Sequence, residues 1–122
     1  MAQTVTTRQS NDLDSRLLDF VREKVNTLIK WDLVRFFHNN PHAANTAANI
    51  ARFAARDPHT VEQELDQLVG SGVLEATIAS SQRIYRYVKD QPTRDLVRAF
   101  VNACDDRDFR VRAIKLVVEG LQ

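Results

Sequence analysis

The stretch IARFAARDPHTVEQELDQLVGSGVLEATIASSQRIYRYV, residues Ile50 to Val88, carries most of the information about how this chain folds. It holds two runs with helical apolar spacing, separated by a break, and then two runs rich in β-forming residues around a polar tip. In the second helical run the apolar side chains recur at i, i+4, i+7 and i+8, at Val61, Leu65, Leu68 and Val69. The pattern predicts two helices, a tight corner and a two-stranded hairpin.

Capping residues give the expected helix boundaries. Either Asn45 or Thr46 can cap the first helix, because both side chains accept a hydrogen bond from a free backbone N–H. Asp57 can cap the second helix, and Pro58 suits its first position, where a missing N–H costs nothing. This helix is expected to end at Gly70.

The hairpin is expected to have strands at residues 73–78 and 84–88 with a polar tip at 80–82. In RIYRYV, alternation places Tyr85 and Tyr87 on one face and the intervening residues on the other. The pattern alone fits either face against the core, and we favour the tyrosine face.

Apolar residues at helical spacing also occur before the two helices and after the hairpin. A long first helix is expected over residues 11–40, ending before Pro41, and the pattern leaves open whether it bends. A C-terminal helical segment begins at Pro92, and the run DDRD at 105–108 interrupts its apolar stripe, so one kinked helix or two helices fit. Residues 1–10 are polar without periodicity, and we expect a disordered tail there.

Composition indicates one globular domain, over residues 11–122. The chain has 122 residues, of which 43% are hydrophobic and 27% charged. No apolar run approaches the roughly 18 residues that a membrane span needs, and the N-terminus lacks the apolar segment of a signal peptide. We therefore expect a cytoplasmic protein without a membrane partner. The net charge of +1 argues against strong nonspecific attraction to nucleic acid.

The sequence offers no catalytic or metal-binding pattern, so we expect neither an enzyme nor a cofactor. His38 and His42 are four residues apart, but Pro41 between them prevents one helix from presenting both on one face. The chain has three glycines, too few for a glycine-rich phosphate loop. Its single cysteine, Cys104, excludes an internal disulfide and lies among apolar residues, where it is expected to fill the core.

Residues 50–88 also resemble a known protein family. Ile50 to Val88 is similar to the winged helix-turn-helix domain of bacterial transcription regulators of the ArsR and MarR type. The similarity consists of an Ile-Ala helix, a short turn, a helix with spaced Val, Leu and Leu, then Gly, an apolar strand and the return strand RIYRYV. It implies a mainly α fold with a small β hairpin: a helix-turn-helix at 45–70, a wing at 73–89, and added helices at 11–40 and 92–122.

The resemblance also implies a set of DNA-contacting residues. In this family the second helix of the helix-turn-helix enters the major groove and the wing lies beside the phosphate backbone. The matching positions for base readout are His59, Thr60, Glu62 and Gln63. The matching positions for phosphate contact are Arg52, Arg56, Arg83 and Arg86. Glu62 departs from the pattern, because a carboxylate near phosphates is repelled.

The function expected from this resemblance is regulation of transcription by binding double-stranded DNA. The flanking helices are expected to form a homodimer, since their apolar stripes exceed what one small core covers. An alternative is a winged helix that acts as a protein–protein adaptor, with the acidic outer face of its docking helix on a basic protein partner. The balance of charge supports that alternative, because residues 43–89 contain five basic and five acidic side chains. A small-molecule or redox sensor is a third, less favoured interpretation.

Overall fold

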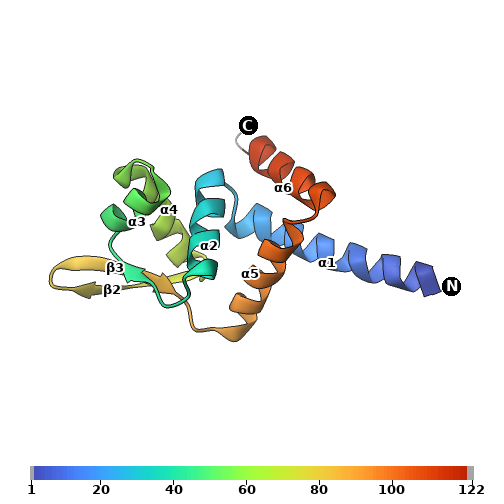
Figure 1. Ribbon diagram of the computed structural model, residues 1–122, viewed down its shortest axis with the longest axis horizontal. Helices are drawn as coiled ribbons and strands as arrows, with labels where there is room; N and C mark the ends of the chain where they lie inside the picture. Colours follow the sequence, from blue (N-terminus) through green and yellow to red (C-terminus); the bar gives the residue numbers. More distant parts are fainter. Residues whose placement is uncertain (1, 121–122) are drawn as a thin grey trace.

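A computed structural model describes the backbone of residues 2–120 and the side chains of residues 12–120. Over this range it is mainly helical, with a small antiparallel sheet, as the sequence predicts (Figure 1). The elements are α1 (Ala2–Lys24), α2 (Leu28–Asn39), β1 (Ala44–Asn45), α3 (Ala47–Ala54), α4 (Pro58–Gly70), β2 (Leu74–Ala79), β3 (Gln82–Tyr87), α5 (Gln91–Ala103) and α6 (Arg107–Gly120). None of the helices in this range combines the length and apolar character that crossing a membrane requires.

The two helices before the hairpin begin where their capping residues predict. The Thr46 hydroxyl accepts a hydrogen bond from the Asn49 backbone N–H at 3.3 Å, so Thr46, rather than its neighbour, caps α3. The Asp57 carboxylate accepts from the Thr60 N–H at 2.9 Å, and Pro58 occupies the first turn of α4. Both predicted caps are confirmed.

The expected single N-terminal helix is in fact two helices. The chain leaves helical geometry after Lys24, and Thr27, in an extended conformation, caps α2 by accepting from the Lys30 N–H at 3.0 Å. The apolar periodicity continues across this break, which is why the sequence pattern did not reveal it. Helix α1 begins at Ala2, so residues 2–10 of the expected disordered tail are helical in this structure, and residue 1 lies outside the described residues. Residues 2–10 contain neither glycine nor proline, so the helix continues through them.

The C-terminal segment forms two helices, which decides between the two arrangements left open by its sequence. Asp90 caps α5 by accepting from the Thr93 N–H at 3.1 Å. The chain turns at residues 104–106, and the Asp106 carboxylate accepts from the Phe109 N–H at 3.0 Å to start α6. The acidic run therefore supplies the cap of a new helix.

The sheet has three antiparallel strands in the order β1-β3-β2. Strand β1 was not expected, because Ala44 and Asn45 carry no β-forming signature. In the hairpin Leu74 lies opposite Tyr87 and Ala79 opposite Gln82. The two-residue tip between the strands is Ser80 and Ser81, whose φ angles of 52° and 67° lie in the left-handed region. Two left-handed residues are what a hairpin turn of this length requires.

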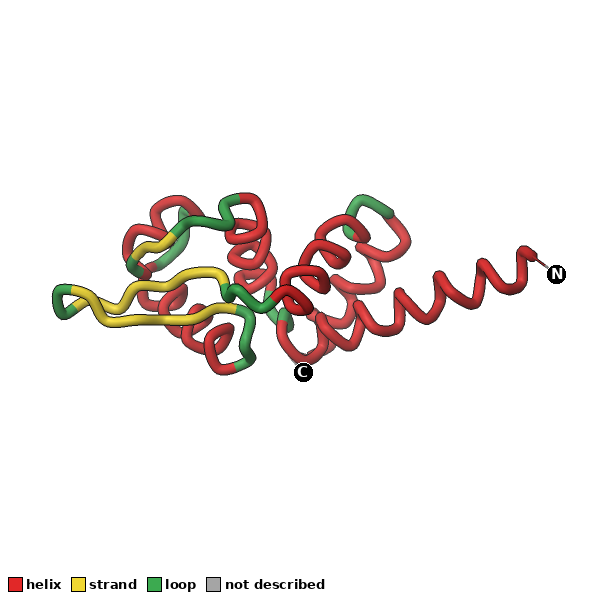
Figure 2. The backbone as a smooth tube through the Cα atoms, turned by 90° about the horizontal axis from the view of Figure 1, so that it is seen from below, coloured by secondary structure: helices red, strands yellow, loops and turns green. Residues whose placement is uncertain are grey.

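One core joins the sheet to the helices. Tyr85 and Tyr87 are buried, which confirms the predicted tyrosine face. Further along the core, the Phe100 ring of α5 makes edge contacts with Phe20 of α1 and Trp31 of α2, at centroid distances of 5.7 and 5.0 Å. Figure 2 shows the hairpin at one end of the molecule and the N-terminal part of α1 projecting from the other.

The two flanking helices pack against each other within the chain. Phe109, Ala113 and Val117 of α6 are buried, and the Arg112 guanidinium bonds the Asp14 carboxylate of α1 at 2.6 Å. Part of the apolar surface that suggested a second subunit is therefore covered by the chain itself.

Candidate nucleic-acid interface

Three of the four predicted base-reading residues lie exposed on the outer face of α4. His59, Glu62 and Gln63 stand at i, i+3 and i+4, so their side chains share one surface. The His59 ring Nε2 and the Gln63 Nε2 approach to 3.4 Å. The fourth, Thr60, is half-buried, and its hydroxyl donates to the Asp57 carboxylate at 3.1 Å. Thr60 thus belongs to the helix cap, and the polar surface open to a ligand is formed by the other three.

The cap at the start of α4 carries a stable negative charge. Hydrogen bonds from the Thr60 backbone and hydroxyl to the carboxylate lower the pKa of Asp57. The charge lies at the positive end of the helix dipole, where it stabilises the first turn. The N-terminus of α4 is therefore capped by a carboxylate of the chain itself.

Glu64, on the same helix, is turned into the protein. Its carboxylate accepts from the Thr27 hydroxyl at 2.6 Å and lies 3.4 Å from the Lys30 ammonium. Only 8% of Glu64 and 4% of Lys30 are exposed, so this is a buried ion pair. The Lys30 ammonium also donates to the side-chain oxygens of Asn26, at 2.9 Å, and of Gln67.

This buried network ties the α1–α2 junction to α4. It borders a cavity of about 360 Å³ that also touches the C-terminal end of α6. The Lys30 ammonium thus has three partners within the chain, through hydrogen bonds to Asn26 and Gln67 and an ion pair with Glu64. Sequence reasoning missed the network, although the signal was a lysine inside the apolar run LIKWDLV. These contacts indicate that Lys30 has a structural role.

Asp66 connects α4 to the return strand of the hairpin. Its carboxylate accepts from the Tyr85 hydroxyl at 2.5 Å and from the Arg83 Nε at 2.9 Å. The Arg83 guanidinium also lies 5.4 Å from the centre of the Tyr85 ring. Burial, followed by the bond to Asp66, raises the pKa of Tyr85 to about 12, so its hydroxyl stays a donor at physiological pH. The orientation of the hairpin relative to α4 is fixed by these contacts.

The acidic outer face expected for α4 is therefore smaller than its sequence indicates. Glu64 is buried against Lys30 and Asp66 is bonded to Arg83, which leaves Glu62 as the exposed acid without an ion pair among the described side chains of this helix. This finding removes most of the charge that supported docking of α4 on a basic protein.

The four predicted phosphate-binding arginines lie in different surroundings. Arg52 is exposed on α3, whereas the Arg56 guanidinium bonds the Asp32 carboxylate of α2 at 2.6 Å. Arg83 is paired with Asp66 near the tip of the hairpin. Arg86 is half-buried in the central strand, between Ala44 and Glu75 of the neighbouring strands. Strand alternation places Arg86 on the face of β3 opposite Arg83. The structure does not gather the four into one basic surface.

An apolar patch lies on α2 and α3 and was not predicted. Phe53 of α3 is 70% exposed and stacks on Phe36 of α2, with ring centroids 5.8 Å apart. A cavity of about 230 Å³ beside them reaches Leu33 and Ile50. The available signal was that Phe53 falls off the buried face of its helix.

Metal ligands and the single cysteine were the candidate reactive groups among residues 12–120. No three histidine, cysteine, aspartate or glutamate side chains in this part of the chain gather in a way that would hold a metal ion. Cys104 is half-buried, and burial raises its pKa to about 11, so it is a thiol rather than a reactive thiolate at neutral pH.

Comparison with known proteins found no matching family model, no matching curated protein and no matching solved structure. The assignment of the candidate site therefore rests on the geometry of this chain.

Proposed function

We propose that this chain is a winged helix-turn-helix protein that binds double-stranded DNA and regulates transcription. In support, α3 and α4 form two helices joined by a tight corner, and the hairpin of β2 and β3 follows directly. The short strand β1 precedes α3 and pairs with β3, which anchors the hairpin beside the helices. Such a hairpin is positioned to lie along a DNA backbone when α4 occupies the major groove.

The observation that carries the proposal is the exposed polar face of α4. His59, Glu62 and Gln63 project from one side of a helix whose other side is locked into the core. Gln63 is chemically suited to pair with adenine, and Glu62 to accept from the amino group of cytosine. His59, in the first turn, is suited to a phosphate or a base edge. A rigid helix with free donors and acceptors on its outer face is what direct readout needs.

The experiment that tests this proposal is selection of bound sequences from random duplex DNA at several salt concentrations. We expect an enriched sequence whose affinity falls steeply as salt rises, because phosphate contacts release counterions. Absence of duplex binding at about 50 mM salt, a concentration at which phosphate contacts are strong, would contradict the proposal.

Two substitutions separate base readout from phosphate contact. Gln63→Ala is expected to weaken binding of the selected site by about 1–3 kcal/mol and to relax its preference at one position. Arg52→Gln is expected to weaken all duplexes similarly and to reduce the salt slope by about 1. Gln91→Ala and Arg16→Gln, which change the same residue types on α5 and α1, are the matched controls and should leave binding unchanged.

A second candidate function, docking on another protein, is favoured by the Phe36–Phe53 patch. An aromatic side chain that is 70% exposed beside an apolar cavity is a typical anchor point for a partner. Under this alternative, a protein partner recovered from nuclease-treated lysate should be lost with Phe53→Ser and retained with Gln63→Ala. The reverse dependence would support DNA binding.

We also propose that the protein acts as a homodimer through α6. Val111, Ile114 and Val118 are 55, 38 and 49% exposed and recur at i, i+3 and i+7. They form a second apolar stripe on α6, beside the one that packs on α1. A two-fold pair of chains would present two copies of α4, which suits an inverted repeat in DNA.

A further inference from the structure

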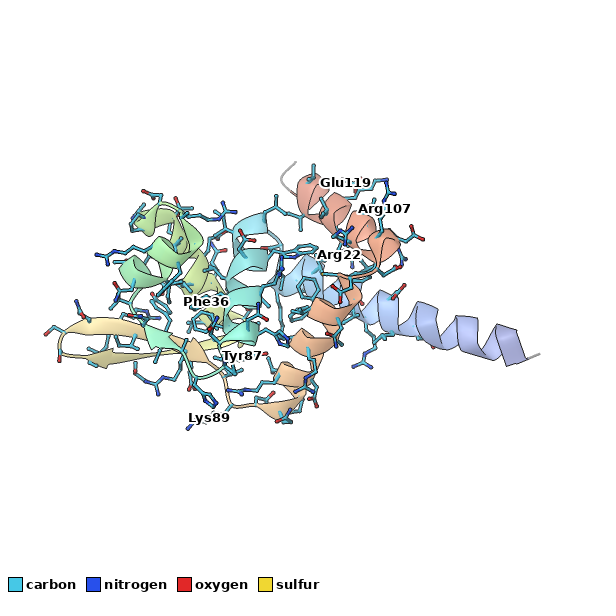
Figure 3. The ribbon with its side chains drawn as sticks, in the orientation of Figure 1. Arg22, Phe36, Tyr87, Lys89, Arg107 and Glu119 are labelled. Carbon is cyan, nitrogen blue, oxygen red and sulfur yellow. The ribbon has the colours of Figure 1, made fainter. Side chains whose placement is uncertain are left out.

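A basic cavity lies where β3 ends, away from the outer face of α4. Its volume is about 180 Å³. It is enclosed by the segment before β1, the last residues of β3 and the start of α5, and its lining residues are Pro41, His42, Ala43, Ala44, Arg86, Tyr87, Lys89 and Arg94. Figure 3 shows Tyr87 and Lys89 close to the point where the chain passes from the strands towards α5. We call this space the basic cavity.

Four residues with basic side chains, from three segments, line the basic cavity, and no carboxylate lines it. Three acids lie nearby in the sequence or the sheet, and one of them, Asp95, accepts from the Gln91 side chain at 2.8 Å and from the Arg98 guanidinium at 3.2 Å. Asp90 is used in capping α5, where its carboxylate accepts from the backbone and the hydroxyl of Thr93. Glu75 is the cross-strand neighbour of Arg86, but among the described side chains it forms no ion pair with it. Among the described side chains, none of the four basic residues of the cavity forms an ion pair.

Two lining residues have polar atoms that lack a partner. Among the described side chains, Arg86 Nε and the Tyr87 hydroxyl are the buried atoms for which no hydrogen bond is found. Tyr87 is only 5% exposed. A buried donor without an acceptor is destabilising, and more so when it carries charge. Both residues border the same cavity, but they are neighbours in β3, so their side chains leave opposite faces of the strand and a bound acceptor there can satisfy one of these unmet donors.

The rest of the basic cavity is already organised for a ligand. The Arg94 Nε donates to the Val88 carbonyl at 2.7 Å, and its guanidinium lies 4.5 Å from the centre of the Tyr87 ring. These contacts hold Arg94 in place while other N–H groups of its guanidinium stay available. Ala44 stands directly opposite Arg86, and its small side chain leaves space beside the arginine.

We propose that the basic cavity binds the phosphate group of a small molecule. Several cations around one cavity, including two guanidinium groups, suit a multiply charged tetrahedral anion better than a single carboxylate. The cavity lies at the opposite end of β3 from the hairpin tip, roughly 17 Å away at the usual rise per strand residue. This assignment goes beyond DNA binding and does not depend on it.

The test is titration of the full-length protein with inorganic phosphate and then pyrophosphate, at constant ionic strength, followed by calorimetry and by NMR of backbone amides. We expect saturable binding with the largest shifts at residues 42–44 and 86–94. Lys89→Gln, an exposed position whose loss should not unfold the protein, is expected to weaken phosphate binding by about tenfold, the effect of one charge-assisted hydrogen bond. Arg86→Gln should weaken it at least as much.

Arg16→Gln is the matched control, because it removes the same charge from the exposed surface of α1. If Arg16→Gln weakened phosphate binding as much as Lys89→Gln does, the effect would be one of net charge and the proposal would be wrong. Absence of saturable binding of both phosphate and pyrophosphate would also overturn it.

A short DNA duplex distinguishes the two sources of a phosphate group. Under the proposal, Lys89→Gln weakens binding of pyrophosphate and leaves duplex binding unchanged. If Lys89→Gln weakened duplex binding but not pyrophosphate binding, the cavity would hold a backbone phosphate of DNA, and the small-molecule assignment would fail.

Discussion

At the scale of single residues, Tyr85 gives the structure a pH dependence that can be measured. Its pKa is raised to about 12, above the ordinary 10, so the folded state keeps the phenol proton more tightly than the unfolded chain does. The stabilisation from Tyr85 is therefore complete below pH 10 and is lost as the pH rises from 10 to 12. Burial also raises the pKa of Tyr87, the second tyrosine of the chain.

We expect Tyr85→Phe to lower the free energy of unfolding at pH 8 by roughly 1.5–3 kcal/mol, because it removes a hydrogen bond to a charged carboxylate. The difference from the wild type should shrink between pH 10 and 12. Denaturant titrations at several pH values measure this difference, and ultraviolet absorbance reports tyrosinate formation directly. A difference that stays constant to pH 12 would show that Tyr85 ionises with its ordinary pKa.

The buried pair of Lys30 and Glu64 should show strong coupling. Lys30→Met leaves the Glu64 carboxylate without its cation, and we expect a loss of about 3–5 kcal/mol. The double variant Lys30→Met, Glu64→Leu should be considerably more stable than the sum of the single losses implies. A double-mutant cycle by chemical denaturation measures this. Additive losses would mean that the two side chains do not interact.

Single residues also show where sequence reasoning ends. The polar face of α4 at His59, Glu62 and Gln63 follows from helical spacing and was predicted. The burial of Glu64 was not, because its partners Thr27 and Lys30 lie 37 and 34 positions away in the sequence. For the same reason no sequence pattern predicted the basic cavity, because its lining residues come from three separate segments. Local spacing predicts which face a residue occupies but not which distant side chain it meets.

At the scale of elements, the helices with strong capping residues were predicted to within a residue. Thr46, Asp57 and Pro58 act on their own first turn, so their effect is local and can be read from the sequence. The break before α2 and the strand β1 were missed. Thr27 caps in the middle of an uninterrupted apolar pattern, and β1 exists only because β3 lies beside it.

The hairpin tip offers a stabilising substitution. Ser81 has a φ of 67°, a conformation that costs a residue with a side chain about 1–2 kcal/mol and costs glycine little. We expect Ser81→Gly to raise the free energy of unfolding by roughly 0.5–1 kcal/mol, since the greater freedom of glycine in the unfolded chain offsets part of the gain. Thermal unfolding measures it. Ser71→Gly, at a position with a φ of −91°, is the control and should not stabilise the protein.

At the scale of the whole molecule, we expect the second apolar stripe of α6, formed by Val111, Ile114 and Val118, to determine whether the protein is a monomer or a dimer. Light scattering should give a mass near twice 13.9 kDa for the wild type. Ile114→Glu places a charge in the centre of the stripe, and we expect it to shift the protein to monomer because an unpaired charge is costly to bury. Leu28→Glu, at an apolar position of similar exposure on α2, is the control and should leave the mass unchanged.

A wild-type mass of 13.9 kDa across the accessible concentration range would exclude the proposed dimer. It would also remove the reason to expect an inverted repeat among selected DNA sequences. The polar face of α4 would then have to act as a single copy.

The sheet order β1-β3-β2 has one more physical consequence. Strand β2 pairs with β3 on one side, and no other strand of residues 2–120 pairs with its free edge. Edge strands are commonly guarded by lysine, proline or a bulge, yet β2 reads LEATIA and ends beside an Ile78 that is 69% exposed. Its open backbone groups are a template for an extended segment of another copy. Growth by strand addition is open-ended, whereas pairing through α6 closes after two chains.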